Sequence, residues 1–99
     1  MLVFSLSASA AETTFKTSEF LSWQRSAIQS YFDANIGMAA LIAGQSNKAQ
    51  GKCIDDWFFS DIESATNEVI AVMKRFSDHH PRAIILAVIE KKCGQIVPR

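Results

Sequence analysis

The chain has few of the residues that interrupt regular structure, and it has no excess of charge of either sign. Its 99 residues include only four glycines and two prolines, and its 10 basic residues are balanced by 10 acidic ones. A protein that binds nucleic acid by electrostatic attraction needs a surplus of cations, so this class of function is disfavoured. No apolar run in the sequence reaches the roughly 18 residues that would span a bilayer. The hydrophobic content of 48% is typical of a globular domain rather than of a disordered chain.

Signals for β-structure are also missing. No long stretch alternates apolar and polar residues, and no Asn-Gly or Asp-Gly pair marks a hairpin. Apolar residues instead recur every three or four positions, which is typical of helices. A chain of this length forms one domain. The sequence therefore predicts an all-α fold, a compact bundle of three to five helices held by one disulfide, with residues 12–99 as a single helical domain.

The N-terminus has the character of an export signal. Residues 1–11 read MLVFSLSASAA, an uncharged apolar stretch followed by the small-x-small pattern Ala8-Ser9-Ala10 of a signal-peptidase site. The positive residues that begin a complete secretory signal are missing. We interpret residues 1–11 as a residual signal-peptide segment with a truncated start. The alternative is an ordinary apolar N-terminus that packs on the domain or frays.

The cysteine count agrees with export. The only two cysteines are Cys53 and Cys93, and an even count in a small exported protein predicts one disulfide. A bridge that closes a loop of about 40 residues stabilises the fold by roughly 4 kcal/mol in the chain-entropy model. The alternative is a pair of buried free thiols in a cytosolic protein.

The longest helical pattern extends from about Ser18 to Gln45. A separate short helix that ends near Arg25–Ser26 is an alternative for its first part. Gly37 marks either a close helix crossing or a break, and Gly44 is a candidate C-cap. Two adjacent apolar stripes are expected to face the core, and the alternative is that their apolar excess forms a dimer face. One stripe contains Phe20, Trp23, Ala27, Tyr31, Ala34, Met38 and Leu41, and the other contains Leu21, Ile28, Phe32, Ile36, Ala39 and Ile42.

Two further helices are predicted in the second half of the chain. Ser60 and Glu63 fit the capping box that begins a helix, and this helix is expected to end near Ser77. Pro81 then suits the first position of the last helix, which extends to Cys93.

Residues 45–59 are expected to form a long irregular loop with an aromatic tip. A loop longer than most helix connections suggests a function, and tryptophan is frequent at binding hot spots. We therefore take Lys52, Asp55, Asp56 and Trp57 as candidate partner-binding residues. The alternative is that the aromatic side chains of this segment fold inward and cover the core.

Groups for catalysis or metal binding are sparse. Asp78, His79 and His80 could ligate a metal, but sequential residues on a turn point apart, so we favour a solvated turn. Asp55 and Asp56 could be paired catalytic carboxylates, but adjacent side chains rarely face each other. The sequence therefore predicts no enzyme, no catalytic or metal site and no cofactor.

Several short elements together resemble the Tai-type immunity family, small periplasmic helical proteins of Gram-negative bacteria. The residues that carry the resemblance are Phe20-Leu21-Ser22-Trp23, the segment from Tyr31 to Ile42 with Gly37, Cys53-Ile54, Val69-Ile70 through Phe76, His80-Pro81, and Ala83 to Ala87 with Cys93. The sequence departs from the family pattern at Asp55-Asp56, where a proline is frequent, and at Lys91-Lys92, where a Phe-Pro pair is frequent.

The resemblance implies a periplasmic protein that inhibits a peptidoglycan amidase effector of type VI secretion by protein–protein contact, commonly as a homodimer. Two alternatives stay open. One is a small periplasmic acid-stress chaperone, which exposes apolar surface as its carboxylates become protonated. The other is an enzyme or metal protein centred on Asp55, Asp56, His79 and His80.

Overall fold

The computed structural model describes residues 15–96, and these residues form five helices and no strand. The predicted all-α bundle is therefore confirmed. The proposed signal-peptide segment, residues 1–11, lies outside the described residues. The helices are α2 (Thr17–Phe20), α3 (Arg25–Ser46), α4 (Lys48–Phe59), α5 (Ile62–Arg75) and α6 (Pro81–Cys93).

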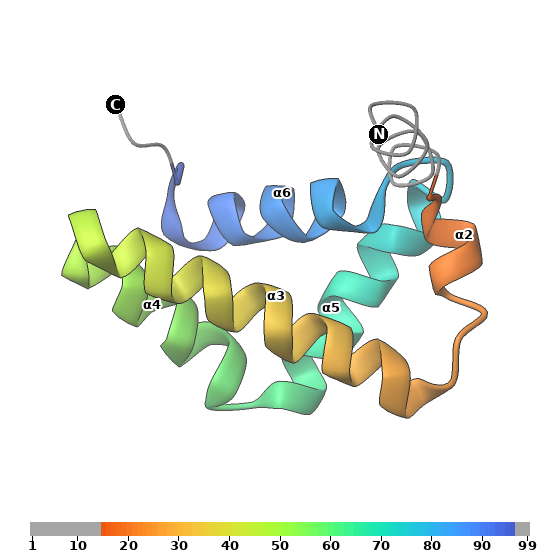
Figure 1. Ribbon diagram of the computed structural model, residues 1–99, viewed down its shortest axis with the longest axis horizontal. Coiled ribbons are helices and arrows are strands. Elements are labelled where there is room, and N and C mark those ends of the chain that lie inside the picture. The colour runs from red at the N-terminus through yellow and green to blue at the C-terminus, as the bar shows by residue number, and fades with distance from the viewer. Residues whose placement is uncertain (1–14, 97–99) are drawn as a thin grey trace, which may run out of the picture.

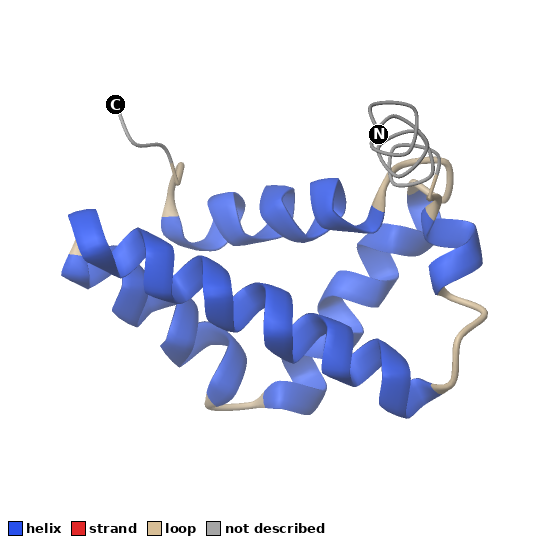
Figure 2. Cartoon of the chain, viewed as in Figure 1, coloured by secondary structure: helices blue, strands red, loops and turns tan. Residues whose placement is uncertain are grey.

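The long helix α3 and its successor α4 form an antiparallel hairpin (Figure 1). Helix α5 lies behind this hairpin, and the colours of Figure 1 show that α6, drawn above the hairpin, runs in the same direction as α3. Figure 2 shows how short the loops between the long helices are. Helices α4 and α6 each contact all of the other long helices, and the most extensive contact is that between α3 and α4. The short α2 packs against α5. None of the helices in the described part of the chain is both long enough and apolar enough to cross a membrane.

Only one side of α3 faces the core. Ile28, Phe32 and Ile36 follow one another at intervals of four and are 5%, 0% and 0% exposed. Met38 and Leu41, which the sequence predicted to be buried, are instead 56% and 61% exposed. The prediction was wrong because the two stripes together are wider than the side of α3 that neighbouring helices cover. The remaining large buried side chains come from every other helix and include Phe20, Ile54, Phe58, Val69, Met73 and Ile89.

The prediction of an irregular loop over residues 45–59 is wrong. Nearly all of this segment is helical, since α3 continues to Ser46 and α4 begins at Lys48. A single residue, Asn47, separates the two helices, and its side chain accepts a hydrogen bond from the Gln50 amide at 3.1 Å. This cap begins α4 directly after α3 ends. The polar residues around Asn47 therefore form a tight turn between two helices and not a long loop. Gly44, predicted as a C-cap, lies within α3.

The boundaries of α5 also differ in detail from the prediction. Asp61, not Ser60, caps its N-terminus, because the Asp61 carboxylate accepts a hydrogen bond from the Ser64 amide at 3.2 Å. The Ser60 hydroxyl instead donates to the Asp56 carbonyl at the end of α4. Helix α5 ends at Arg75, slightly before the predicted end.

Helix α6 has the predicted bounds, and its two ends are held by side chains. Pro81 is its first residue, and the Nδ1 atom of His80 accepts a hydrogen bond from the Arg82 amide at 3.1 Å. At the other end, the disulfide Cys53–Cys93 joins α4 to the last residue of α6 across a sequence separation of 40. The predicted disulfide is thus confirmed.

Candidate functional site

The surface between α3 and α4 is shaped by a close contact of two glycines. A Cβ atom added to Gly51 would lie 2.8 Å from the Cα atom of Gly44 and 2.9 Å from the carbonyl oxygen of Ala40. Any larger residue at position 51 would push the helices apart. The absence of side chains here brings the two backbones together and leaves the outer surface of the hairpin hollow.

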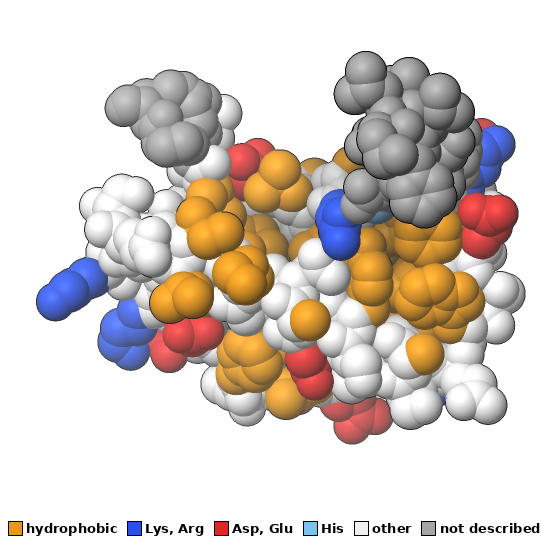
Figure 3. All heavy atoms as spheres, viewed as in Figure 1, with side chains coloured by type: hydrophobic (Ala, Val, Ile, Leu, Met, Phe, Trp, Pro, Cys, Tyr) orange, Lys and Arg blue, Asp and Glu red, His pale blue; other side chains and the backbone are white. Residues whose placement is uncertain are grey.

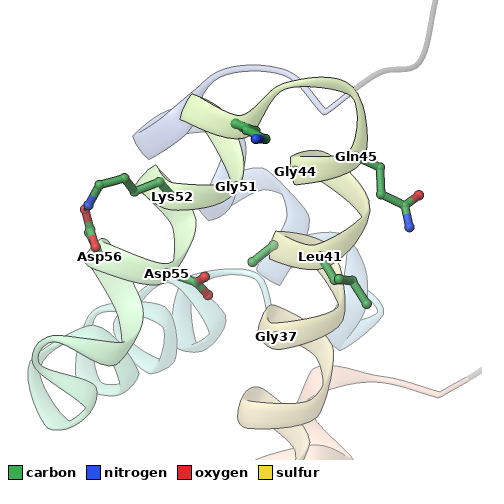
Figure 4. A pocket seen from close by; sticks show the side chains of 10 residues that line it. Gly37, Leu41, Gly44, Gln45, Gly51, Lys52, Asp55 and Asp56 are labelled. Carbon is green, nitrogen blue, oxygen red and sulfur yellow. The ribbon is translucent and has the colours of Figure 1, made fainter.

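This hollow is a shallow groove of about 820 Å³ on the outside of the hairpin (Figure 4). Its floor is formed by small residues, and its rim carries longer polar and apolar side chains. The lining residues are Gly37, Ala40, Leu41, Gly44, Gln45, Lys48, Gly51, Lys52, Asp55 and Asp56. Three of the four candidate partner-binding residues, Lys52, Asp55 and Asp56, therefore line one groove.

The charged residues of α4 are divided between two sides of the helix. Lys52 and Asp56 form an exposed ion pair with a distance of 2.8 Å between Nζ and Oδ2, and Asp56 raises the pKa of Lys52 through this hydrogen bond and its charge. Figure 4 shows this pair on the outer side of α4, whereas Asp55 projects toward α3. Asp55 has no ion-pair or hydrogen-bond partner for its carboxylate among residues 15–96. The two adjacent aspartates thus have different environments and do not converge on one point.

Trp57, the fourth candidate residue, lies away from the groove. It is half-buried, packs against the core and donates a hydrogen bond from Nε1 to Oε1 of Glu68 on α5 at 3.3 Å. The other carboxylate oxygen of Glu68 lies 2.8 Å from Nζ of Lys92 on α6. Hydrogen bonding from Lys92 is the largest cause of a lowered pKa at Glu68, which desolvation partly opposes. Trp57 therefore bonds α4 to α5 instead of forming the tip of a loop, and Glu68 extends this connection to α6.

The second surface feature is the apolar excess on α3, for which the sequence left both the core and a dimer face open. Met38, Leu41 and Ile42 on α3 are 56%, 61% and 52% exposed, and Leu86 on α6 is 44% exposed. Figure 3 shows hydrophobic side chains gathered over the C-terminal half of α3 and the neighbouring edge of α6. Leu41 belongs both to this apolar face and to the groove. The combined width of the two apolar stripes on α3 was the signal that could have revealed an exposed face.

The histidines are placed at the turn between α5 and α6. His80 caps α6 through its ring nitrogen, and the exposed His79 ring packs edge-on against Phe76 at 5.5 Å between centroids. Within residues 15–96, no group of three His, Cys, Asp or Glu side chains is arranged to hold a metal ion.

The chain matches no protein-family model, no curated protein and no solved structure. The resemblance to the Tai-type immunity family thus stays a prediction that rests on the residues quoted for it.

Proposed function

We propose that this protein is an exported, non-catalytic inhibitor that binds a peptidoglycan amidase effector through the exposed face of α3 and the adjoining groove. The observation that carries the proposal is the exposed apolar surface of Met38, Leu41 and Ile42 on an ordered helix. Exposed apolar patches on small proteins mark interaction sites. The amidase as partner, and the periplasm as compartment, come from the resemblance to the immunity family.

The composition of α3 supports a protein partner. From residue 26 to residue 46 this helix carries a single charged side chain, Asp33. The centres of protein–protein interfaces are depleted in charge and enriched in apolar side chains, because charged groups are costly to desolvate. A helix face that combines Met38, Leu41 and Ile42 with almost no charge has this composition.

The support behind the surface is rigid. Helix α4 is fixed to α6 by the Cys53–Cys93 disulfide and to α5 by the hydrogen bond from Trp57 to Glu68. Helix α3 is in turn packed on α4 along the glycine contact. A binding surface that is ordered before it meets its partner loses less conformational entropy on association. This organisation suits an inhibitor that has to hold a partner tightly.

The proposal is tested with a peptidoglycan amidase effector of type VI secretion. The oxidised protein without residues 1–11 is mixed with the amidase, and release of peptidoglycan fragments is followed. We expect inhibition by the wild type and at least a tenfold weaker inhibition by Leu41→Asp, because a buried carboxylate at an apolar contact is unfavourable. Ala71→Asp, which places the same charge on an exposed position of α5, is the control and should inhibit like the wild type. A wild type that does not inhibit, or two variants that inhibit equally, would contradict the proposal.

Export is tested separately by intact mass. The protein recovered from the periplasm should lack residues 1 to about 11, and its two thiols should be alkylated only after reduction. Retention of Met1 together with a cytoplasmic location would remove the compartment that this function requires.

An acid-stress chaperone is the second candidate, and Glu68 is the observation that favours it. Protonation of this carboxylate would weaken its contacts with both Trp57 and Lys92, which join three helices. Such a chaperone would bind the dye ANS and suppress aggregation of an acid-denatured client near pH 3. Native-like spectra without ANS binding at that pH would exclude this role.

A further inference from the structure

We infer that the groove between α3 and α4 receives an arginine side chain of the protein partner, with its guanidinium group at Asp55 and its methylene stem beside Leu41. This inference rests on the proposed function, because it specifies the chemistry of the partner at the same surface.

An exposed carboxylate at one end of the groove is available to a cation of the partner. Lys52 and Asp56 neutralise each other at 2.8 Å, while the carboxylate of Asp55 is left without a partner among residues 15–96. Figure 4 shows that Asp55 projects toward α3, on the side of the groove. A partner that brings a cation to this position would form a charge-assisted hydrogen bond with it, and a partner that brings an anion would be repelled.

The shape of the floor suits a long and slender side chain. Gly37, Gly44 and Gly51 line the groove with backbone only, and Ala40 adds a single methyl group. Leu41, which is 61% exposed, provides an apolar wall. The three methylene groups of an arginine can lie on such a surface while its charged end reaches a carboxylate at the rim.

Arginine fits this site better than lysine does. Its guanidinium group is planar, is more weakly hydrated than an ammonium group and can donate two parallel hydrogen bonds to one carboxylate. Lysine would present a strongly hydrated point charge, which loses more hydration on entering the groove.

The lysines of α4 limit the groove to one basic side chain. Lys48 lines the same groove and precedes Asp55 by seven residues, which corresponds to about 10 Å along a helix. A second cation of the partner would meet Lys48 and be repelled. The groove is therefore suited to a single arginine that is flanked by neutral or acidic residues, and a polybasic segment would bind less well.

The test uses N-acetyl-L-arginine methylamide as the probe and N-acetyl-L-citrulline methylamide as its uncharged isostere. Both are titrated into the oxidised, ¹⁵N-labelled protein without residues 1–11, and amide shifts are followed by NMR. We expect saturable shifts for the arginine probe at Gly37, Leu41, Gly44 and Asp55. Citrulline should bind at least fivefold more weakly, and Asp55→Asn should weaken arginine binding by the same factor.

Glu63→Gln is the matched control, because it removes one negative charge from an exposed residue on α5 without touching the groove. This variant should bind the arginine probe within twofold of the wild type. Equal binding of arginine and citrulline, unchanged binding by Asp55→Asn, or shifts that occur elsewhere would overturn the inference.

Amidase inhibition by Asp55→Asn separates this inference from the function on which it rests. If the wild type inhibits and Asp55→Asn inhibits at least fivefold more weakly, the proposed function and the arginine contact both stand. If the wild type and Asp55→Asn inhibit equally, the arginine contact is wrong and the inhibitor function remains. If neither inhibits although the arginine probe binds at Asp55, the proposed function fails while the groove keeps its ligand chemistry. A dimer in sedimentation that Asp55→Asn dissociates would instead show that a second copy of this chain occupies the groove, which overturns the assignment to a partner.

Discussion

Gly51 lies directly against Gly44, and this contact sets the distance between α3 and α4. A Cβ atom on Gly51 would be 2.8 Å from the Cα atom of Gly44, whereas a Cβ atom on Gly44 would have its nearest neighbour, the Cα atom of Gly51, at 3.8 Å. The space for a side chain is thus much smaller at Gly51 than at Gly44, although both glycines lie within helices. The backbone contact also forms the floor of the groove that we propose as a binding site.

Gly51→Ala is expected to lower the free energy of unfolding by about 1–3 kcal/mol, because the added methyl group has to displace backbone atoms. Alanine has the higher helix propensity by about 1 kcal/mol, and this gain offsets part of the loss. Urea unfolding followed by circular dichroism measures the difference. Gly44→Ala is the control and should be neutral or slightly stabilising. The geometry of the hairpin would be contradicted if both variants were equally stable.

Removal of the disulfide should reduce stability without changing the helical fold. The bridge Cys53–Cys93 spans a sequence separation of 40, for which the chain-entropy model predicts roughly 4 kcal/mol. The double variant Cys53→Ala/Cys93→Ala should show this loss in urea unfolding, and reduction of the wild type should produce the same shift. Full alkylation of both thiols with an unchanged unfolding midpoint would show that the bridge contributes nothing.

Glu68 should make stability depend on pH in the acid range. Its pKa in the folded protein is lowered from the ordinary value of 4.5, chiefly by the hydrogen bond from Lys92. The stabilisation is therefore fully present above about pH 4.5 and is lost as the pH falls through the lowered pKa. The two side chains are 38% and 40% exposed, so solvent screening limits the effect to about 1 kcal/mol or less.

The variant Glu68→Gln tests this dependence. Its unfolding midpoint in urea should be below that of the wild type at pH 7, and the gap should be smaller at pH 3. Lys92→Met should reproduce the same pattern, since it removes the partner that lowers the pKa. A gap that is equally large at both pH values would assign the effect to packing instead of ionisation.

The N-cap of α6 depends on an acceptor at position 80. The Nδ1 atom of His80 accepts a hydrogen bond from the Arg82 amide, so His80→Ala should destabilise the protein by about 1 kcal/mol. His80→Asn restores a capping acceptor and should recover most of that loss. Thermal unfolding of the three proteins decides the matter, and an asparagine variant no more stable than the alanine variant would argue against the cap.

Several local features could be predicted from the sequence because they depend on neighbouring residues only. Pro81 begins α6 since a missing amide does no harm in a first turn. The disulfide is not a local feature, and it could be predicted because the chain has only two cysteines. The capping box at Ser60 was misplaced by one residue because Asp61, which follows it, is an equally good cap and is the residue that meets the Ser64 amide.

The placement of the candidate partner-binding residues could be predicted only in part, and their role stays a prediction. Lys52, Asp55 and Asp56 do line one groove, but they do so on a helix and not on a loop. The polar run before Cys53 resembled a loop because the corner at Asn47 is built from the same residue types. Trp57 does not line the groove with Asp55 and Asp56, because successive residues of a helix point in different directions. Its side chain points toward Glu68.

The sequence by itself determined the helical class, the start and end of α6, and the covalent link between two distant segments. These depend on periodicity, on proline geometry and on the chemistry of two thiols. Only the tertiary structure decided which stripe of α3 is buried, since Ile36 and Leu41 are equally apolar and differ only in what packs beside them. The groove likewise exists because Gly51 meets Gly44, a contact between two helices that no local pattern specifies.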